Sequence, residues 1–309
     1  MSAHTVEPPE HVLRDYPLAR LTTIRTGGTA AWFARPRKVE ELEALLSWAE
    51  HAQLDVGVVG SGSNLLVADA GFAGLVLKLD GPLAVIEHED TRLICGGGAR
   101  LPQAAARAAA LGLAGIEFGV SIPGTVGGAV RMNANANGGD LARVLEWVEV
   151  CTASGVDRRV PDQLGFAYRR SNLGPREVVA RASFALEPSD PERVKAKLAD
   201  LRARRREAQP AGIKTFGSTF KNPEDERAEG RTAGRLLEEA GCKGLAIGDA
   251  RFSPKHANFI ENRGAATTAD VLGLIAEGQR RVREHSGIEL EPEVQLLGDA
   301  GFAFEEQRS

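Results

Sequence analysis

Val56-Gly57-Val58-Val59-Gly60-Ser61-Gly62-Ser63-Asn64 is the stretch of sequence that decides the fold. Its first four residues are valines around one glycine, which predicts a short buried strand. The next five residues are all small, and the two glycines among them permit backbone angles that other residues rarely adopt. A strand that leads directly into such a loop lets backbone N–H groups converge on an anion such as a pyrophosphate. Taken alone, the loop fits a tight structural turn at least as well.

The residues on either side of this stretch predict the beginning of an α/β domain. Apolar residues recur at helical spacing from Val39 to Gln53, and glutamates come early in that segment, where the helix dipole favours acids. Strands are expected before this helix and after the loop, at residues 30–36, 65–67 and 75–79. The order strand, helix, strand is typical of an α/β domain.

The rest of the chain continues to mix strands and helices. Proline and acidic residues at 187–192 mark a boundary, and the basic residues that follow are interpreted as the solvated face of a helix rather than as a polyanion site. A long glycine-rich loop is expected from Gly115 to Gly139. The remaining expected strands lie within residues 83–96 (with a turn at 88–90), 144–152 and 178–186, and the remaining expected helices lie at residues 101–111, 194–206, 232–240 and 269–285.

The composition is that of an ordinary globular protein, with 43% hydrophobic and 26% charged residues in a chain of 309. This length predicts about two or three domains of roughly 100–200 residues each. The net charge of −4 gives no electrostatic support for nucleic-acid binding. The sequence has no apolar run of about 18 residues, and residues 1–15 lack the basic start and apolar core of a signal peptide. We therefore expect a cytoplasmic protein without a membrane span, and a monomer is compatible with the sequence.

The cysteines argue against a metal or dithiol site. Cys95, Cys151 and Cys242 lie far apart, and the sequence contains no CxxC pair. A structural zinc site or a dithiol redox site is therefore not expected, and the three thiols are expected to be reduced and mostly buried.

Glycine is the compositional outlier, because many of the 35 glycines fall in three clusters. Besides residues 60–64, these are Thr26-Gly27-Gly28, which follows Arg25, and the segment from Ser121 to Ala129. Pro123 fixes one backbone angle of the third cluster, and its glycines open the backbone to a flat ligand. A cofactor with a pyrophosphate and a planar ring needs loops of both kinds, although a fold rich in turns accounts for them as well. The chain contains neither a GxxxxGK[ST] nor a GxGxxG pattern.

Two further motifs carry polar groups suited to catalysis. Gly217-Ser218-Thr219-Phe220-Lys221-Asn222-Pro223 contains a serine with no histidine motif nearby, so a Ser–His–Asp arrangement does not apply directly. Such a serine can still donate a proton. Glu291-Pro292-Glu293-Val294 places a carboxylate near the C-terminus. In isolation, the sequence favours a turn cap for Ser218, a surface position for Arg169 and an ion-pair partner at a strand end for Glu293.

Together these motifs resemble the UDP-N-acetylenolpyruvoylglucosamine reductase family, whose characteristic elements appear in order over about residues 20–298. The resemblance implies the short form of the family, because the stretch between Tyr168 and Gly217 has no room for an additional loop. The matching elements are residues 23–28, 60–64, 122–124, 127–128, 168–171, 217–223, 253, 256–259 and 290–294.

The resemblance implies an α+β fold. Its first part is a two-lobed FAD-binding domain of the vanillyl-alcohol-oxidase type, with lobes at residues 1–80 and 81–190. A C-terminal α/β substrate-binding domain covers residues 191–309. The implied activity is the NADPH-dependent reduction of UDP-N-acetylglucosamine enolpyruvate to UDP-N-acetylmuramate in peptidoglycan precursor synthesis, with non-covalent FAD. The partners implied are thus NADPH and a nucleotide sugar.

The resemblance also implies roles for individual residues. Ser218 corresponds to the family's proton donor, Arg169 to its substrate-polarising arginine and Glu293 to its catalytic glutamate. The substrate-binding positions implied are Tyr168, Lys221, Asn222 and His256. The FAD-binding positions implied are Arg25, Gly60, Ser61, Gly62, Ser63, Asn64, Ile122, Pro123, Gly124, Thr125 and Gly128.

One departure from the family pattern stands out. The family usually reads Asn-Ala-Gly-Ala-Tyr-Gly after the third glycine cluster, whereas this chain reads Asn133-Ala134-Asn135-Ala136-Asn137-Gly138. Two asparagines therefore replace a glycine and a tyrosine, which affects the expected shape of this loop.

Two alternatives compete with this interpretation. Another FAD-dependent oxidoreductase of the same superfamily, with covalently attached flavin, needs a histidine or cysteine in a glycine-rich loop, and residues 60–64 and 121–129 contain neither. A nucleotide-sugar-binding regulator without activity has no need of Ser218, Arg169 and Glu293 together.

Overall fold

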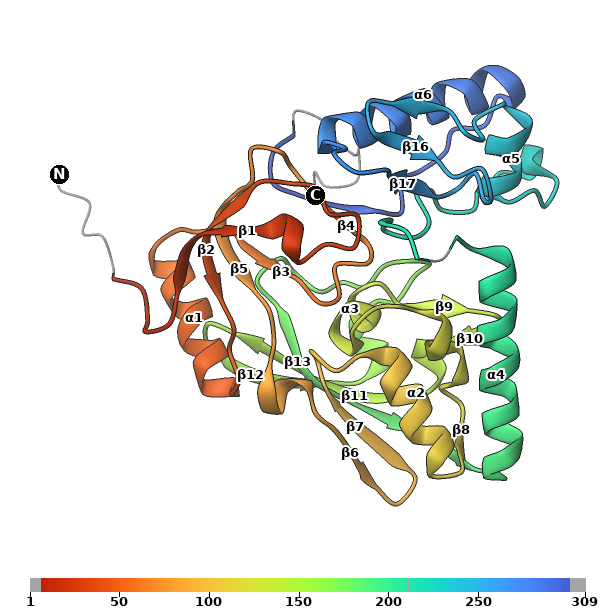
Figure 1. Cartoon of the computed structure of the whole chain (residues 1–309). Coiled ribbons are helices and arrows are strands. Elements are labelled where there is room, and N and C mark those ends of the chain that lie inside the picture. The colour runs from red at the N-terminus through yellow and green to blue at the C-terminus, as the bar shows by residue number, and fades with distance from the viewer. Residues whose placement is uncertain (1–6, 211, 301–309) are drawn as a thin grey trace. The chain divides into compact units, whose positions relative to one another are not determined.

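The computed structural model describes residues 7–210 and 212–300, which form two compact units (Figure 1). Unit 1 consists of the described residues up to 15, residues 31–61 and residues 73–205, and unit 2 of residues 16–30, 62–72 and the described residues from 206 onward. The chain therefore passes from one unit to the other in the middle of the 60–64 loop. The predicted division at residues 80 and 190 remains a prediction, and its outer ends lie outside the described residues. No helix within residues 7–210 and 212–300 is long and apolar enough to cross a membrane.

Unit 1 is built around a five-stranded antiparallel sheet. Val178 and Ala180 of its central strand belong to one hydrophobic core, and Val179 and Phe184 belong to another. The strand is buried on both faces, which is why its sequence is almost continuously apolar. In sheet order the strands are β12 (Gly155–Arg159), β11 (Leu145–Thr152), β13 (Val178–Ala185), β7 (Arg92–Gly96) and β6 (Ile86–Glu89).

The helices of unit 1 cover this sheet. α1 (Val39–His51) packs against β11, and α2 (Leu101–Ala110) and α3 (Val126–Arg131) pack against β7. α1 buries Leu42, Leu45 and Ala49, as its helical spacing predicts. α4 (Pro191–Ala208) buries three apolar residues and exposes a basic face, whose Lys195, Lys197 and Arg204 pair with carboxylates.

A second sheet contains the strands around the opening stretch. Its order is β1-β2-β5-β3, with β3 parallel to β5, and α1 lies in the chain between β2 and β3, as predicted. Its strands are β1 (Leu13–Pro17), β2 (Thr29–Ala34), β3 (Val56–Val58) and β5 (Phe72–Leu77). The short antiparallel pairs of unit 1 are β8 (Leu113–Ala114) with β14 (Glu187–Pro188), and β9 (Asn135–Ala136) with β10 (Gly139–Asp140).

The predicted long loop from Gly115 to Gly139 is wrong. It contains a 3-10 helix, then α3, then the β9–β10 hairpin. Thr125 caps α3 by accepting a hydrogen bond from the Gly128 N–H at 3.4 Å. A Cβ on Gly127 would lie 3.0 Å from the Gly97 carbonyl oxygen, so this glycine serves close packing rather than a flexible loop.

Unit 2 combines helices with a three-stranded antiparallel sheet. Its core includes Phe216, Phe220 and Phe252. α6 (Thr268–Ser286) begins with a capping box between Thr267 and Asp270 and ends where Gly287 adopts a left-handed conformation. β18 (Gln295–Leu297) pairs parallel with β4 (Leu65–Val67). The other elements of unit 2 are α5 (Ala233–Glu239), β15 (Ala246–Ile247), β16 (Ala250–Phe252) and β17 (Ile260–Asn262).

Short 3-10 helices connect these elements. All three cysteines are buried free thiols, as expected. Burial raises the pKa of Cys95 to about 12, which makes it a poor nucleophile. The 3-10 helices are η1 (Leu18–Arg20), η2 (Gly81–Ala84), η3 (Glu117–Ser121), η4 (Leu141–Arg143), η5 (Pro161–Leu164) and η6 (Glu226–Ala228).

Candidate active site

The segment that carries Ser218 is hydrogen-bonded to two other segments of unit 2. The Thr219 N–H donates to the Asn258 carbonyl at 2.8 Å, and the buried Asn258 side chain makes two bonds of 2.9 Å with the backbone of Phe220. The Glu293 N–H donates to the Thr219 carbonyl at 2.8 Å. The structure therefore places the half-buried Ser218 and Glu293 on neighbouring, hydrogen-bonded segments.

Residues 60–64 are called here the phosphate loop, because a pyrophosphate is predicted to bind there. The second half of this loop, Ser63 and Asn64, lies beside these segments. Asn64 donates through Nδ2 to the Glu293 carbonyl at 3.1 Å and accepts from the Gln295 N–H at 3.0 Å. Gly217 has a φ of +90°, and a Cβ there would lie 3.5 Å from the Ser63 carbonyl oxygen. Within unit 2, Ser63 and Asn64 are thus neighbours of both predicted catalytic segments.

Gly62 joins this loop to the first glycine cluster. Thr23 donates to the Gly62 carbonyl through its N–H and its Oγ1, both at 3.0 Å. Gly62 has a φ of +64°, and a Cβ there would lie 2.0 Å from the Leu21 carbonyl oxygen, so the fold itself requires glycine. Arg25 is exposed in the adjoining loop, and its Nη1 donates to the Arg20 carbonyl at 2.5 Å.

Unit 1 brings the first half of the phosphate loop to the third glycine cluster. A Cβ on Gly60 would lie 2.3 Å from Thr125 Oγ1. Lys78 Nζ donates to the Gly60 carbonyl, and the pKa of Lys78 is lowered first by burial and then by the nearby charges of Arg35 and Arg100. The sequence prediction missed Lys78. The available signal was a lysine that directly follows the apolar strand β5.

Arg169 lies at the tip of a tight turn in unit 1. Ala167 and Arg170 exchange backbone hydrogen bonds of 3.0 and 3.1 Å across this turn. Arg169 has a φ of +57°, a conformation that is costly for a residue with a side chain. Its Nη1 donates to both the carbonyl oxygen of Asn135, at 3.1 Å, and Asn135 Oδ1, at 2.9 Å. The guanidinium carbon lies 5.1 Å from the centroid of the exposed Tyr168 ring.

The other predicted substrate-binding residues lie in unit 2. Lys221 forms an ion pair with Glu291, and Asn222 Oδ1 accepts from the Ala233 N–H at 3.1 Å at the start of α5. His256 Nδ1 lies 3.2 Å from the Asn258 N–H, which donates to it. Burial lowers the pKa of His256, so the ring is neutral at neutral pH and carries its proton on Nε2.

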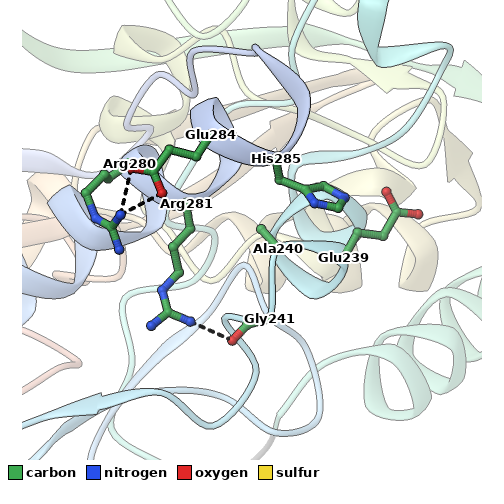
Figure 2. A pocket seen from close by; sticks show the side chains of 7 residues that line it. All are labelled: Glu239, Ala240, Gly241, Arg280, Arg281, Glu284 and His285. Carbon is green, nitrogen blue, oxygen red and sulfur yellow. Dashed lines mark hydrogen bonds and ion pairs between the residues drawn. The ribbon is translucent and has the colours of Figure 1, made fainter.

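A surface hollow of unit 2 contains none of these residues (Figure 2). Its arginines are already engaged. Arg280 pairs with Glu277 and Glu284, and Arg281 bonds to Glu277 and to the Gly241 carbonyl. These two arginines hold the pKa of Glu277 down to about 2. Neighbouring carboxylates neutralise the arginines of this hollow. The hollow therefore offers no net positive charge to an anionic substrate.

Comparison with known proteins agrees, for both parts of the chain, with the family that the sequence motifs resemble. Residues 30–160 match the model of an FAD-binding domain family. Residues 209–297 match the model of the UDP-N-acetylenolpyruvoylglucosamine reductase C-terminal domain. The chain is 46% identical over 288 residues to the UDP-N-acetylenolpyruvoylglucosamine reductase of Myxococcus xanthus, covering 92% of this chain and 91% of that one.

The chain belongs to the UDP-N-acetylenolpyruvoylglucosamine reductase family. The reductase of Gluconobacter oxydans is 42% identical over 283 residues, covering 91% of this chain and 90% of that one. The crystal structure of the Thermus caldophilus reductase superposes with a TM-score of 0.78 at 36% identity, covering 93% of this chain and 98% of that one. The expected family, an FAD-binding domain followed by the C-terminal domain of the reductase, and the FAD-dependent oxidoreductase class are confirmed.

Several groups of unit 1 fit an FAD. Lys78, Arg35 and Arg100 place positive charge around the Gly60 backbone, which suits a pyrophosphate. Within the described part of the chain, the buried Oδ1 of Asn133 has no hydrogen-bond partner, and a bound ligand can supply one. A Cβ on Gly124 would meet only Ile122 Cγ2, at 3.8 Å, so the space beside this glycine is not filled by the protein.

Gly124→Leu is expected to weaken FAD binding without disturbing the protein. A bulky side chain at a packed contact costs about 1–3 kcal/mol, so the Kd for FAD should rise roughly 5- to 150-fold. Flavin absorbance per protein and fluorescence titration of the FAD-free form measure the effect. Gly174→Leu, at another glycine of unit 1 where a Cβ meets only the Glu177 side chain, is the matched control. An unchanged Kd for Gly124→Leu would show that FAD does not lie against this glycine.

Proposed function

We propose that the protein reduces UDP-N-acetylglucosamine enolpyruvate to UDP-N-acetylmuramate with NADPH, as a step of peptidoglycan precursor synthesis in the cytoplasm. The observation that carries this proposal is the hydrogen bond from the Glu293 N–H to the Thr219 carbonyl at 2.8 Å. This bond joins the segments of Ser218 and Glu293 in unit 2, which supports Ser218 as the proton donor and Glu293 as a second catalytic residue. Membership of the reductase family supports the same reaction.

FAD, when bound, supplies hydride transfer from NADPH to the β-carbon of the enolpyruvyl group. The residues of unit 1 that hold it in this proposal are Gly60, Ser61, the segment from Ile122 to Thr125, and Gly128. The other FAD-binding positions of this proposal are Arg25 and residues 62–64. Small residues and backbone N–H groups of these loops suit a diphosphate and a flat ring.

Arg169 stabilises the charge that hydride addition creates in the substrate. Negative charge builds at the α-carbon and spreads into the adjoining carboxylate. A guanidinium is always protonated, and its planar fork matches a carboxylate. Because Asn135 holds Nη1 of Arg169, the donors of the fork are oriented before the substrate arrives.

Ser218 completes the reduction by donating a proton to the α-carbon. Its segment is held by backbone bonds to Asn258 and Glu293, so the hydroxyl is attached to a rigid part of unit 2. A positioned proton donor accelerates such a step by about 10²–10⁴. Glu293, on the neighbouring segment, supports the same developing charge when its carboxyl group is protonated or paired with a cation.

The remaining polar residues bind the nucleotide-sugar substrate in this proposal. Asn222 uses Oδ1 to accept from the Ala233 N–H, so its NH₂ group is the part that donates to a phosphate oxygen in this proposal. His256 offers Nε2–H as a neutral donor because Nδ1 accepts from the Asn258 N–H. Lys221, held by Glu291, and Tyr168 complete the set of contacts.

An anaerobic titration tests the proposed function. The purified protein should show flavin absorbance bands that bleach on stoichiometric NADPH. The bands should return when UDP-N-acetylglucosamine enolpyruvate is added, with formation of UDP-N-acetylmuramate. Bleaching by NADPH without recovery on adding this substrate would indicate another FAD-dependent oxidoreductase. Absence of bleaching by NADPH would contradict the proposed hydride donor.

A further inference from the structure

Every second residue from 131 to 137 uses its side chain in a hydrogen bond. Together these bonds connect the region of the Arg169 turn to Ser121, next to the third glycine cluster of unit 1. Arg131 donates to the carbonyls of Leu173, Gly174 and Glu177 at 3.1, 2.9 and 2.7 Å. Asn133 donates to the Ala167 carbonyl at 3.1 Å, and Asn135 accepts from Arg169. Asn137 donates to Ser121 Oγ at 3.2 Å, next to the third glycine cluster. The turn that carries Arg169 is therefore attached at several points to one short segment.

The local fold explains why this segment can reach both the Arg169 turn and Ser121. Asn137 and Gly138 have φ values of +52° and +78° and connect β9 to β10. Asn-Gly is the preferred pair for a two-residue hairpin in which both residues have positive φ. The hairpin places Asn135 on β9, opposite Asp140.

Arg169 is held in an unfavourable backbone conformation. A φ of +57° at a residue with a side chain persists only where the surroundings impose it, and such residues are concentrated at functional sites. Two acceptors on one residue, the carbonyl oxygen and Oδ1 of Asn135, engage the same Nη1. They fix the direction of the guanidinium and leave its charge uncompensated by that contact, because an amide oxygen is neutral.

We propose that Asn135 is the positioning residue for Arg169, an inference that rests on the proposed function. Its side-chain oxygen orients the guanidinium toward the substrate carboxylate without neutralising it. A glycine at this position keeps the main-chain acceptor and loses the side-chain acceptor. An aspartate keeps the geometry but adds a negative charge that competes with the substrate carboxylate for Arg169.

Two variants test this positioning role with different expected results. Asn135→Ala should slow flavin reoxidation by the enolpyruvyl substrate about tenfold, the typical effect of losing one hydrogen bond to a charged group. Asn135→Asp should mainly raise KM for the enolpyruvyl substrate, and it should weaken binding of UDP-N-acetylmuramate measured calorimetrically by about tenfold or more. Flavin reduction by NADPH and the unfolding temperature should stay near those of the unmodified protein in both. Asn172→Ala, whose exposed side chain donates to the Gln163 carbonyl, is the matched control.

A double-mutant cycle separates this inference from the proposed function. In an Arg169→Ala background, Asn135→Ala should have no further effect on reoxidation, because its partner is gone. The same tenfold loss in that background, or normal reoxidation by Asn135→Ala alone, would overturn the positioning role while leaving Arg169 in the mechanism. If Arg169→Ala itself reoxidises normally, the proposed role of Arg169 fails, and the role of Asn135 fails with it.

Discussion

Arg169→Ala is expected to slow reoxidation of the flavin by UDP-N-acetylglucosamine enolpyruvate by about 10²–10³, the usual loss when a preorganised charge stabiliser is removed. Flavin reduction by NADPH should change far less. Alanine and arginine share the same difficulty at a φ of +57°, so the comparison isolates the guanidinium from the backbone strain. Stopped-flow absorbance of the two half-reactions measures the effect.

Two further substitutions test whether the planar guanidinium of Arg169 itself is required. Arg169→Lys should recover only part of the rate, because a lysine has the charge but not the planar fork. Arg170→Ala, at the exposed neighbour whose backbone closes the same turn, should reoxidise at close to the normal rate. Nearly full activity of Arg169→Lys would show that a point charge is sufficient and that the fork has no role.

Ser218→Ala is expected to slow the same half-reaction by about 10²–10⁴, the contribution of a positioned general acid. FAD binding and flavin reduction by NADPH should remain close to normal. The alanine leaves intact the backbone bonds to Asn258 and Glu293, which involve neighbouring main-chain groups. Stopped-flow measurement with each reactant in turn separates the two half-reactions.

The controls for Ser218 distinguish proton donation from binding. Ser218→Cys should keep part of the activity, since a thiol also donates a proton. Ser286→Ala removes a hydroxyl that donates to the Val282 carbonyl within α6, and it should leave the rates of both half-reactions unchanged. Equal slowing of both half-reactions by Ser218→Ala would mean that this serine only positions a shared binding site. An unchanged rate in both would remove it from the mechanism.

The glycine clusters show where interpretation from local sequence succeeds and where it stops. The pattern around residues 60–64 and 121–129 indicated a cofactor with a pyrophosphate and a planar ring, and the match to an FAD-binding domain family agrees. The same glycines also predicted a structureless segment from 115 to 139, which is wrong. Gly127 is needed because its backbone lies against Gly97, and the Asn137-Gly138 pair forms a hairpin turn. A glycine required for close packing and a glycine required for a loop look alike in a sequence.

The sequence by itself determined the elements whose signals are local. The helical spacing of α1, the capping residues of α6 and the apolar strands β3 and β4 all follow from residues close together in the chain. The order of motifs along the chain was also enough to indicate the family and its cofactor.

Only the tertiary structure decided which of the predicted residues are neighbours. Asn64 bonds to Glu293, Gly60 lies against Thr125, and Asn135 holds Arg169. These contacts join segments far apart in the sequence through single hydrogen bonds and close backbone approaches, which leave no repeating pattern in the residues between them. Lys78 was missed for the same reason: its sequence neighbours show only that a lysine follows an apolar strand, whereas its position beside Gly60 comes from the pairing of β5 with β3.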